Sequence, residues 1–266
     1  MNIAIITTVI NFELYDKTAK HFPPEISRYV IDGRNGMHGI HSIEFMMKKL
    51  KAESIDWIVM CDEDVIWKKT SLLFDMIDYM ANNNYMVSGV RDGGVIAQRV
   101  YNPYVINTFF SVLHFSGLQK IWNKREIRNQ HTIIEKEFDD NIDNLLGNYD
   151  STSSFEPYYS FYLWLRRKKE NILFLDAAMT VYDELTNSVL FNNQVMLYHT
   201  WYARSYGSNP NQTKRINNVL EHIHPTNESK EKIDYIYFKD PYFSLIKKMR
   251  KQQNRFTYKL NSLFKP

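Results

Sequence analysis

Three consecutive carboxylates, Asp62, Glu63 and Asp64, follow the apolar segment Trp57–Cys61. Alternate residues of an extended segment point the same way, so Asp62 and Asp64 can face one point while Glu63 points elsewhere. Two carboxylates at one point repel each other unless a cation joins them. Oxygen ligands favour Mg²⁺ or Mn²⁺ over zinc. The spacing therefore predicts a divalent-cation site at the end of a buried strand. The alternative is a solvated acidic turn before a helix, where carboxylates interact favourably with the helix dipole.

The segments around this triplet are typical of a parallel sheet. Apolar, β-branched runs predict strands at Ile3–Val9, Arg28–Ile31, Trp57–Cys61 and Tyr85–Val90. Apolar residues spaced three and four apart predict helices at 40–50 and 72–80, between the second, third and fourth strands. Alternation of strand and helix favours parallel strands joined by crossover helices. Because ligands bind at the carboxyl ends of such strands, we expect the polar segments 32–36, 62–64 and 91–94 to converge on one crevice.

The remaining segments are less regular. Residues 11–24 form a polar and aromatic connection, 102–122 are apolar and aromatic, and 123–150 are expected to be an insertion or a mobile loop. A helix is predicted at Tyr158–Lys169 and strands at Asn171–Asp176 and Val195–Tyr198, whereas 208–227 are helical or loose. The aromatic residues at 158–164 favour a core position over a sugar-binding platform.

The C-terminal 26 residues, from Pro241 to Pro266, hold seven Lys or Arg and no acidic residue, with apolar side chains between them. This pattern predicts a basic amphipathic tail. Such a tail suits an anionic membrane surface, where each cation contributes about 1 kcal/mol. The alternative is a C-terminal helix packed on the domain with its basic face in water.

Composition excludes several classes of protein. A net charge of +3 over 266 residues is too small to indicate a nucleic-acid partner. The single cysteine, Cys61, allows no disulfide within the chain and favours a reducing, cytoplasmic compartment. The N-terminal residues predict neither a signal peptide nor a membrane helix. With the tail included, we expect a cytoplasmic protein that is peripheral at the inner face of a membrane.

The order of a first strand, a second strand ending in Asp32, a helix, and an apolar strand ending in Asp62-x-Asp64 resembles the nucleotide-diphospho-sugar glycosyltransferases of the GT-A fold. The resemblance covers roughly residues 1–206 and is specific in order and spacing but loose in residue identity. It implies an α/β, GT-A-like single domain with a mainly parallel central sheet flanked by helices. Residues 1–240 are then the catalytic domain, with a nucleotide-binding half at 1–100 and an acceptor half at 101–240. The basic helical tail follows at 241–266.

The resemblance also implies roles for individual residues. The expected donor-binding residues are Thr7, Thr8, Val9, Asp32, Arg34, Asp62, Arg91 and Arg204. The expected ligands of Mn²⁺ or Mg²⁺ are Asp62, Asp64 and His199. Glu156 is the first choice for a catalytic base, and Asp92 and Asp150 are the next candidates. The family has a Glu-Asp pair where this chain has Glu156-Pro157, so the identity of the base stays open.

Each of these residues has a simpler interpretation. Asp32 and the glycine after it can form a plain turn, and Arg91 with Asp92 can be a surface ion pair of little energetic weight. His199 can be an ordinary hydrogen-bonded histidine. Glu156 can simply begin a helix, because the proline that follows it fits the first helical position.

The implied activity is metal-dependent glycosyl transfer of the hexosyltransferase class, as in polysaccharide biosynthesis. The donor is a nucleotide-diphosphate sugar, with a UDP-sugar as the first expectation, and the acceptor is a hydroxyl of a glycan or of a lipid-linked glycan. Inversion and retention both stay open. A nucleotidyltransferase would have a glycine-rich loop after the first strand, which the segment TTVINFELYD lacks. A metal-dependent nuclease would need a basic surface for its nucleic acid, and the near-neutral net charge argues against one. A third alternative is a non-catalytic protein that binds sugar nucleotides. Only an assay distinguishes it from an enzyme, because it would bind the donor without releasing nucleoside diphosphate.

Overall fold

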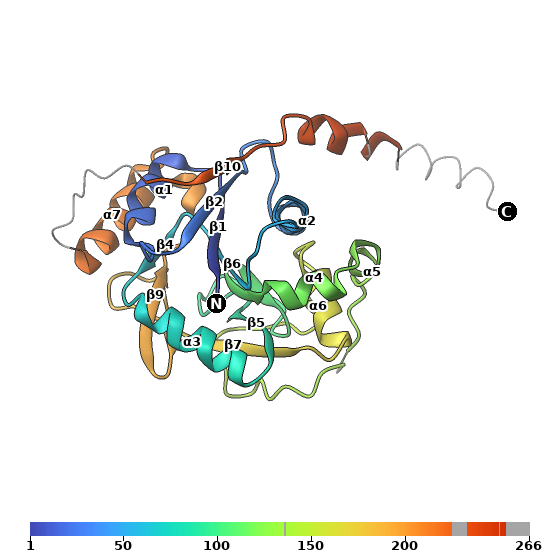
Figure 1. The fold of residues 1–266 in the computed structure, drawn as a ribbon. Helices are drawn as coiled ribbons and strands as arrows, with labels where there is room; N and C mark the ends of the chain where they lie inside the picture. Colours follow the sequence, from blue (N-terminus) through green and yellow to red (C-terminus); the bar gives the residue numbers. More distant parts are fainter. Residues whose placement is uncertain (136, 225–232, 250, 254–266) are drawn as a thin grey trace.

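The computed structural model describes residues 1–135, 137–224, 233–249 and 251–253 of the chain. Within this part, ten strands form one sheet in the order β10-β2-β1-β3-β6-β5-β7-β8-β9-β4 (Figure 1). The strands are β1 (Ile3–Val9), β2 (Ser27–Asp32), β3 (Trp57–Cys61), β4 (Val65–Trp67), β5 (Tyr85–Arg91), β6 (Ile106–His114), β7 (Asn171–Met179), β8 (Asn187–Phe191), β9 (Gln194–His199) and β10 (Ile236–Phe238). The helices are α1 (Phe12–Thr18), α2 (Ile40–Lys49), α3 (Ser71–Asn82), α4 (Phe115–Ile121), α5 (Lys124–Arg128), α6 (Tyr159–Arg167) and α7 (Pro210–Ile223), with short 3₁₀ turns at Ala19–His21 and Ala203–Ser205.

The sheet combines a parallel and an antiparallel part. Strands β10, β2, β1 and β3 pair in parallel, as do β5 and β7. Strand β6 lies between β3 and β5 and is antiparallel to both, so β5 and β7 run in the same direction as β3. Strands β8, β9 and β4 continue the sheet as antiparallel neighbours. The predicted α/β fold with a central sheet between helices is therefore confirmed, but the sheet is not mainly parallel as expected: it is mixed, because β6 and the β8–β9–β4 part pair in the antiparallel sense.

Two cores lie on opposite faces of the sheet because side chains alternate along each strand. Ile6, Ile31, Ile58 and Met60 pack with apolar residues of α2, α4 and α6 in one core. Ile5, Val30 and Val59 pack with α1 and α3 in the other. Figure 1 shows α2, α4 and α6 together on one side of the sheet and α3 on the other. The central strands are buried on both faces, which accounts for their nearly continuous apolar sequences.

Several elements differ from the sequence-based expectation. The connection at 11–24 contains α1, whose first turn is capped by the Asn11 side chain. Strand β6 was not predicted in the aromatic segment 102–122, and the short strands β4, β8 and β10 were also missed. The predicted strands at Ile3–Val9 and Trp57–Cys61 have the predicted boundaries. The missed strands are short or antiparallel, and β4 and β10 pair with partners far away in the sequence, whereas β8 pairs with its neighbours β7 and β9.

The polar stretch 123–150 carries a half-buried carboxylate, Asp140, that binds two arginines of the domain. It begins with α5 and continues as irregular chain. Asp140 forms ion pairs with Arg91 at 3.1 Å and with Arg166 of α6. Arg91 also stacks on the Phe174 ring, with its guanidinium 3.7 Å from the ring centroid. Asp140 therefore joins this insertion to β5 and α6.

The described part of the basic tail is helical at 243–249 and remains in contact with the domain. Phe243 packs at the edge of one core, and Lys247 Nζ donates a hydrogen bond to the carbonyl of Gly36 at 3.3 Å. Tyr242, Leu245 and Met249 are 66%, 56% and 60% exposed. Arg250 and residues 254–266 of the predicted tail lie outside the described residues. None of the helices in the described ranges combines the length and the apolar character needed to cross a membrane.

Candidate functional site

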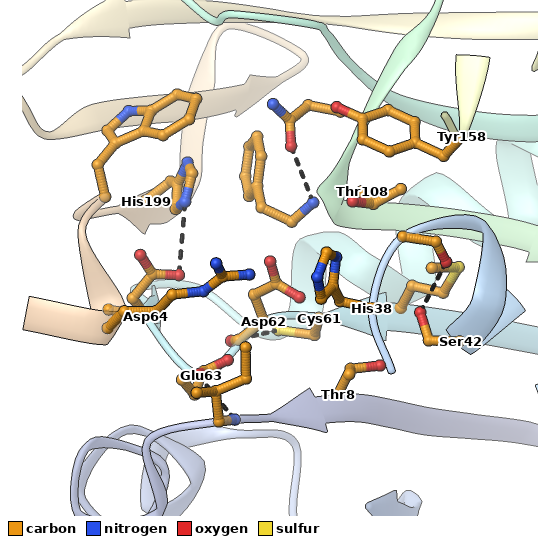
Figure 2. Close-up of a pocket in the computed structure, with 18 of the residues that line it drawn as sticks. Thr8, His38, Ser42, Cys61, Asp62, Glu63, Asp64, Thr108, Tyr158 and His199 are labelled. Atoms are coloured by element: carbon orange, nitrogen blue, oxygen red, sulfur yellow. Dashed lines mark hydrogen bonds and ion pairs between the residues drawn. The ribbon is translucent and has the colours of Figure 1, made fainter. Parts of the chain in front are cut away.

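A cavity of about 480 Å³ opens at the carboxyl ends of β1, β2 and β3 (Figure 2). Six of the residues expected at the site line it: Thr8, Asp62, Asp64, Glu156, His199 and Arg204. They come from four separate regions of the chain, which the sheet order brings to one edge. This edge is the one expected for a parallel sheet with its ligand site at the strand ends.

The three residues of the acidic triplet have different partners. The Glu63 carboxylate accepts hydrogen bonds from the backbone N–H groups of Ile10 and Asn11, both at 3.1 Å, and thereby holds the β1–α1 connection (Figure 2). The Asp64 carbonyl accepts hydrogen bonds from the Thr200 N–H at 3.1 Å and hydroxyl at 3.2 Å, which ties the triplet to the end of β9. Glu63 is therefore engaged with backbone, and the side chains of Asp62 and Asp64 are the ones available to a ligand.

Negative charge is concentrated in this part of the cavity. Burial, followed by the neighbouring Glu63 and Asp64 carboxylates, raises the pKa of Asp62 well above its usual value, and Arg204 acts in the opposite direction. Burial and the Asp64 charge raise the pKa of Glu63 to about 7, while its backbone hydrogen bonds oppose that rise. Like charges this close favour a counter-charge among them.

His199 lies against Asp64 and a wall of aromatic rings. Its Nε2 is 3.4 Å from Asp64 Oδ1, and its ring is stacked on Phe109 with centroids 3.8 Å apart. Its Nδ1 is buried and has no hydrogen-bond partner among the described residues. Carboxylate oxygens and an imidazole nitrogen are suitable donors for Mn²⁺. The described residues nevertheless contain no group of three or more His, Cys, Asp or Glu arranged to hold a metal ion. A cation here would need further oxygen ligands from outside the protein.

A strained turn after β9 supplies one wall of the cavity. Trp201 and Tyr202 have φ of 60° and 62°, a left-handed conformation that is uncommon for bulky residues. Arg215 of α7 donates hydrogen bonds to the carbonyls of Thr200 at 2.6 Å and Trp201 at 3.0 Å, and pairs with Asp183 at 2.8 Å. The turn places both aromatic side chains on the cavity wall. Arg215 stabilises it from outside the cavity.

Glu156 lines the cavity together with Arg99 and Arg204. Burial and the charge of Asp92 raise its pKa, while Arg99 and Arg204 lower it. Its backbone carbonyl accepts a hydrogen bond from the Tyr159 N–H at 3.1 Å, so Glu156 also begins the turn that leads into α6. A carboxylate that lines a cavity and faces positive charge can accept a proton from a bound hydroxyl.

Asp32 and Arg34 are bound to each other and do not line the cavity. The Arg34 Nε and Nη2 donate to the two Asp32 carboxylate oxygens, each at 2.9 Å. Tyr237 of β10 donates a further hydrogen bond to Asp32 at 2.6 Å. Hydrogen bonds from Arg34 lower the pKa of Asp32. The two residues expected at the base or ribose thus hold β10 on the edge of the sheet.

The remaining expected residues do not line the cavity. Asp92 accepts hydrogen bonds from the Asn107 amide at 2.5 Å, the Gly93 N–H at 2.8 Å and the Tyr159 hydroxyl at 2.5 Å. Thr7 is fully buried, and its hydroxyl has no partner among the described residues. Val9 belongs to one of the two cores. Arg91 pairs with Asp140 as described above, and Asp150 accepts hydrogen bonds from Thr152.

Several cavity residues carry no sequence signal that identifies them. His38, Arg99, Asn107, Tyr158 and Trp201 all line it. His38 precedes α2, and burial followed by the charges of Arg204 and Lys247 lowers its pKa. Arg99 and Asn107 lie within irregular or aromatic segments whose folded positions depend on β6. Only the position of His38, just before a predicted helix and after a polar strand end, could have indicated it.

The comparisons with known proteins give weak structural likenesses. The chain matches no family model and no curated protein sequence. Among solved structures it is similar to the mannosyltransferase PcManGT from Pyrobaculum calidifontis in complex with GDP-Man and Mn²⁺, with a TM-score of 0.33, 12% identity, and coverage of 45% of this chain and 46% of that chain. It is also similar to A197 from STIV, with a TM-score of 0.39, 13% identity, and coverage of 73% and 96%. A third structure is a glycosyltransferase involved in glycosylation of the major capsid of PBCV-1, with a TM-score of 0.31, 16% identity, and coverage of 56% and 80%.

Two of these three neighbours are glycosyltransferases by description. The chain spans less than half of the length of PcManGT. Because all three TM-scores are below 0.5, the functional argument rests on the cavity and not on these likenesses.

Proposed function

We propose that this protein is a metal-dependent glycosyltransferase that moves a hexosyl group from a nucleotide-diphosphate sugar to an acceptor hydroxyl. A UDP-sugar is the first donor to test, and the acceptor is a glycan or a lipid-linked glycan. One observation carries the proposal. Asp62, Asp64, Glu156, His199 and Arg204 come from distant parts of the sequence and line a single cavity at the strand ends.

The cavity has the groups that departure of a diphosphate requires. A bound Mn²⁺ or Mg²⁺ would supply Lewis-acid stabilisation of the negative charge that grows on the leaving diphosphate. Asp62 and Asp64 would hold that cation, with His199 beside Asp64, and donor oxygens would complete the coordination. Arg204 would bind a phosphate through its planar guanidinium. Glu63 has no role in binding the cation, because its carboxylate is bound to the backbone of the β1–α1 connection.

Glu156 is the residue best placed to act on the acceptor. It lines the cavity, whereas the carboxylate oxygens of Asp92 already accept three hydrogen bonds within the protein. In an inverting reaction, Glu156 would remove the proton of the acceptor hydroxyl as that oxygen attacks the anomeric carbon. In a retaining reaction, no base is required at this position.

Donor turnover tests the proposal. The protein is incubated with UDP- and GDP-sugars, with and without Mn²⁺, and both thermal stabilisation and release of nucleoside diphosphate are measured. We expect metal-dependent stabilisation and release, and loss of both in Asp64→Asn. Asp75→Asn, an exposed substitution on α3, is the matched control. Stabilisation without release of diphosphate would indicate a non-catalytic binding protein. Full release by Asp64→Asn in the presence of a chelator would contradict the proposed metal site.

The role of Glu156 has its own test. Glu156→Gln keeps the shape of the side chain and removes its basicity, so we expect turnover to fall by about 10²–10⁴ if Glu156 is the general base. Donor affinity is expected to change little. Glu184→Gln, an exposed substitution away from the cavity, is the control. Unchanged turnover in Glu156→Gln would mean that the base is another group or that configuration is retained.

We also propose that the tail at 241–266 follows a catalytic domain at 1–240, which it contacts through Phe243 and Lys247, and binds an anionic membrane surface. Leu245 and Met249 are exposed on the described helical turn, next to Lys247 and Lys248. Sedimentation with phosphatidylglycerol vesicles tests this. We expect binding that weakens as salt rises and that is lost in the double variant Leu245→Ser, Met249→Ser. Vesicle binding that the double variant retains in full would contradict the proposal.

A further inference from the structure

A continuous ladder of planar side chains leads from the floor of the cavity to the protein surface. It begins with Phe109 and His199, whose centroids are 3.8 Å apart, and continues to Trp201 at 4.1 Å from His199. The Arg99 guanidinium lies 4.3 Å from the centroid of Trp201 and 5.1 Å from that of Tyr101. The Tyr101 ring is stacked on Phe155 at 4.8 Å with an interplanar angle of 18°.

The outer end of the ladder is exposed although the fold holds it rigidly. Phe155 is 64% exposed, and Tyr202, on the cavity wall next to Trp201, is 44% exposed. The Asn102 amide donates to the carbonyls of Ser151 and Ser153, each at 3.1 Å, and the Asp150 N–H donates to the Tyr101 carbonyl at 2.9 Å. These bonds fix the segment that carries Phe155 against the one that carries Tyr101. The exposed ring is therefore preorganised for a ligand.

The polar groups beside the ladder specify the kind of ligand. Arg99 lies between the rings of Trp201 and Tyr101, and Glu156 follows Phe155 directly in the sequence and lines the cavity. A sugar ring has C–H groups on one face, which suit the negative face of an aromatic ring. It has hydroxyls around its edge, which can bond to a carboxylate and a guanidinium. An acyl chain would use the rings but leave both charged groups without partners.

We propose that Phe155 and Tyr202, braced by Tyr101, Arg99 and Trp201, form a carbohydrate-binding subsite at the mouth of the cavity. An oligosaccharide bound there stacks one sugar ring on Phe155 and reaches past Glu156 into the cavity. Its assignment as the acceptor rests on the proposed function, whereas the binding itself does not. The aromatic residues of 158–164 do not form this subsite, because they are buried with the core, although Tyr158 also lines the inner cavity.

Binding of defined oligosaccharides tests the subsite. Maltohexaose, cellohexaose, mannohexaose and chitohexaose are titrated against the full chain, and the change in tryptophan fluorescence is followed. We expect saturable binding of at least one of the four. Phe155→Ala should raise the Kd of that oligosaccharide about tenfold, the loss of one stacking contact of about 1.4 kcal/mol. Phe155→Tyr should restore the affinity of the unmodified protein.

Tyr242→Ala is the matched control, because Tyr242 is 66% exposed and lies on the tail away from the ladder. Equal effects of Phe155→Ala and Tyr242→Ala would overturn the proposal, as would failure of all four oligosaccharides to bind. Binding of UDP- and GDP-sugars is measured in parallel on the same variants. A loss of nucleotide-sugar affinity in Phe155→Ala would overturn it as well, because the ladder would then hold the nucleobase. Binding of nucleotide sugars without any oligosaccharide would refute the subsite alone and leave the proposed function standing.

Discussion

Replacement of Arg215 by methionine should destabilise the turn that forms one wall of the cavity. The guanidinium donates to the carbonyls of Thr200 and Trp201, and it pairs with Asp183. Methionine has a similar apolar stem but no donor. The left-handed residues Trp201 and Tyr202 would then keep their backbone strain, of order 1–3 kcal/mol each, without the contacts that offset it.

The expected loss follows from the bonds that disappear. Hydrogen bonds from a charged donor contribute about 1.5–3 kcal/mol each. Asp183 keeps its hydrogen bonds from Leu185 and Thr186, so losing the ion pair with Arg215 costs little. Most of the loss in stability comes from the unpaired carbonyls of Thr200 and Trp201. The Arg215 side chain is 14% exposed, and water can replace part of what is lost. We therefore expect the free energy of unfolding to fall by about 3 kcal/mol, and the Tm by about 6–12 °C for a domain of this size.

Urea denaturation of the variant and of Lys214→Met measures this loss. Lys214 is the preceding residue of α7 and is exposed, so its substitution matches the change in helix composition. Arg215→Lys keeps the charge but not the planar set of donors, and should lie between the two. A loss in Arg215→Met no larger than that in Lys214→Met would refute the idea that Arg215 holds the turn. The turn would then be stabilised by the packing of Trp201 itself.

Two further predictions concern groups away from the cavity. Asp140→Asn leaves two arginines, 12% and 13% exposed, without their shared counter-charge. We therefore expect the free energy of unfolding to fall by about 2–3 kcal/mol. The control Asp143→Asn, at an exposed position, should change it little, and equal losses of the two variants by calorimetry would contradict the prediction. His21 and His224 are stacked with centroids 3.5 Å apart, and burial followed by the charge of His224 lowers the pKa of His21 to about 4. Because the unfolded chain then binds protons more readily than the folded chain, stability should fall as pH drops from about 6.5 towards 4.5, by about 1 kcal/mol for this half-exposed pair. His21→Phe should make that fall shallower in urea titrations at each pH, and an unchanged slope would count against the pair as its source.

Local sequence was sufficient for the central strands and for recognising the acidic triplet at the end of one of them. The strands at Ile3–Val9 and Trp57–Cys61 have the predicted boundaries, because buried parallel strands need continuous apolar runs that few other elements share. The sequence also separated Glu63 from Asp62 and Asp64, but the extended geometry expected for this segment was wrong. Residues 62–64 form a turn in which the Val65 N–H donates to the Asp62 carbonyl at 3.3 Å, and the Glu63 carboxylate is turned to the β1–α1 backbone. The strand boundaries depend on residues within a few positions of one another, whereas Ile10 and Asn11, which bind Glu63, are more than fifty positions away.

The identity of the cavity residues depended on the tertiary structure. Asp32 and Arg34 have the residue types of a ligand site, yet they pair with each other and with Tyr237, which is about two hundred positions away. The ladder from Trp201 through Arg99 to Phe155 joins three segments whose local patterns predict no contact. A sequence pattern records which side chains share a face of one element. Which elements meet at one sheet edge is decided by strand pairing and packing, and these are collective properties of the folded chain.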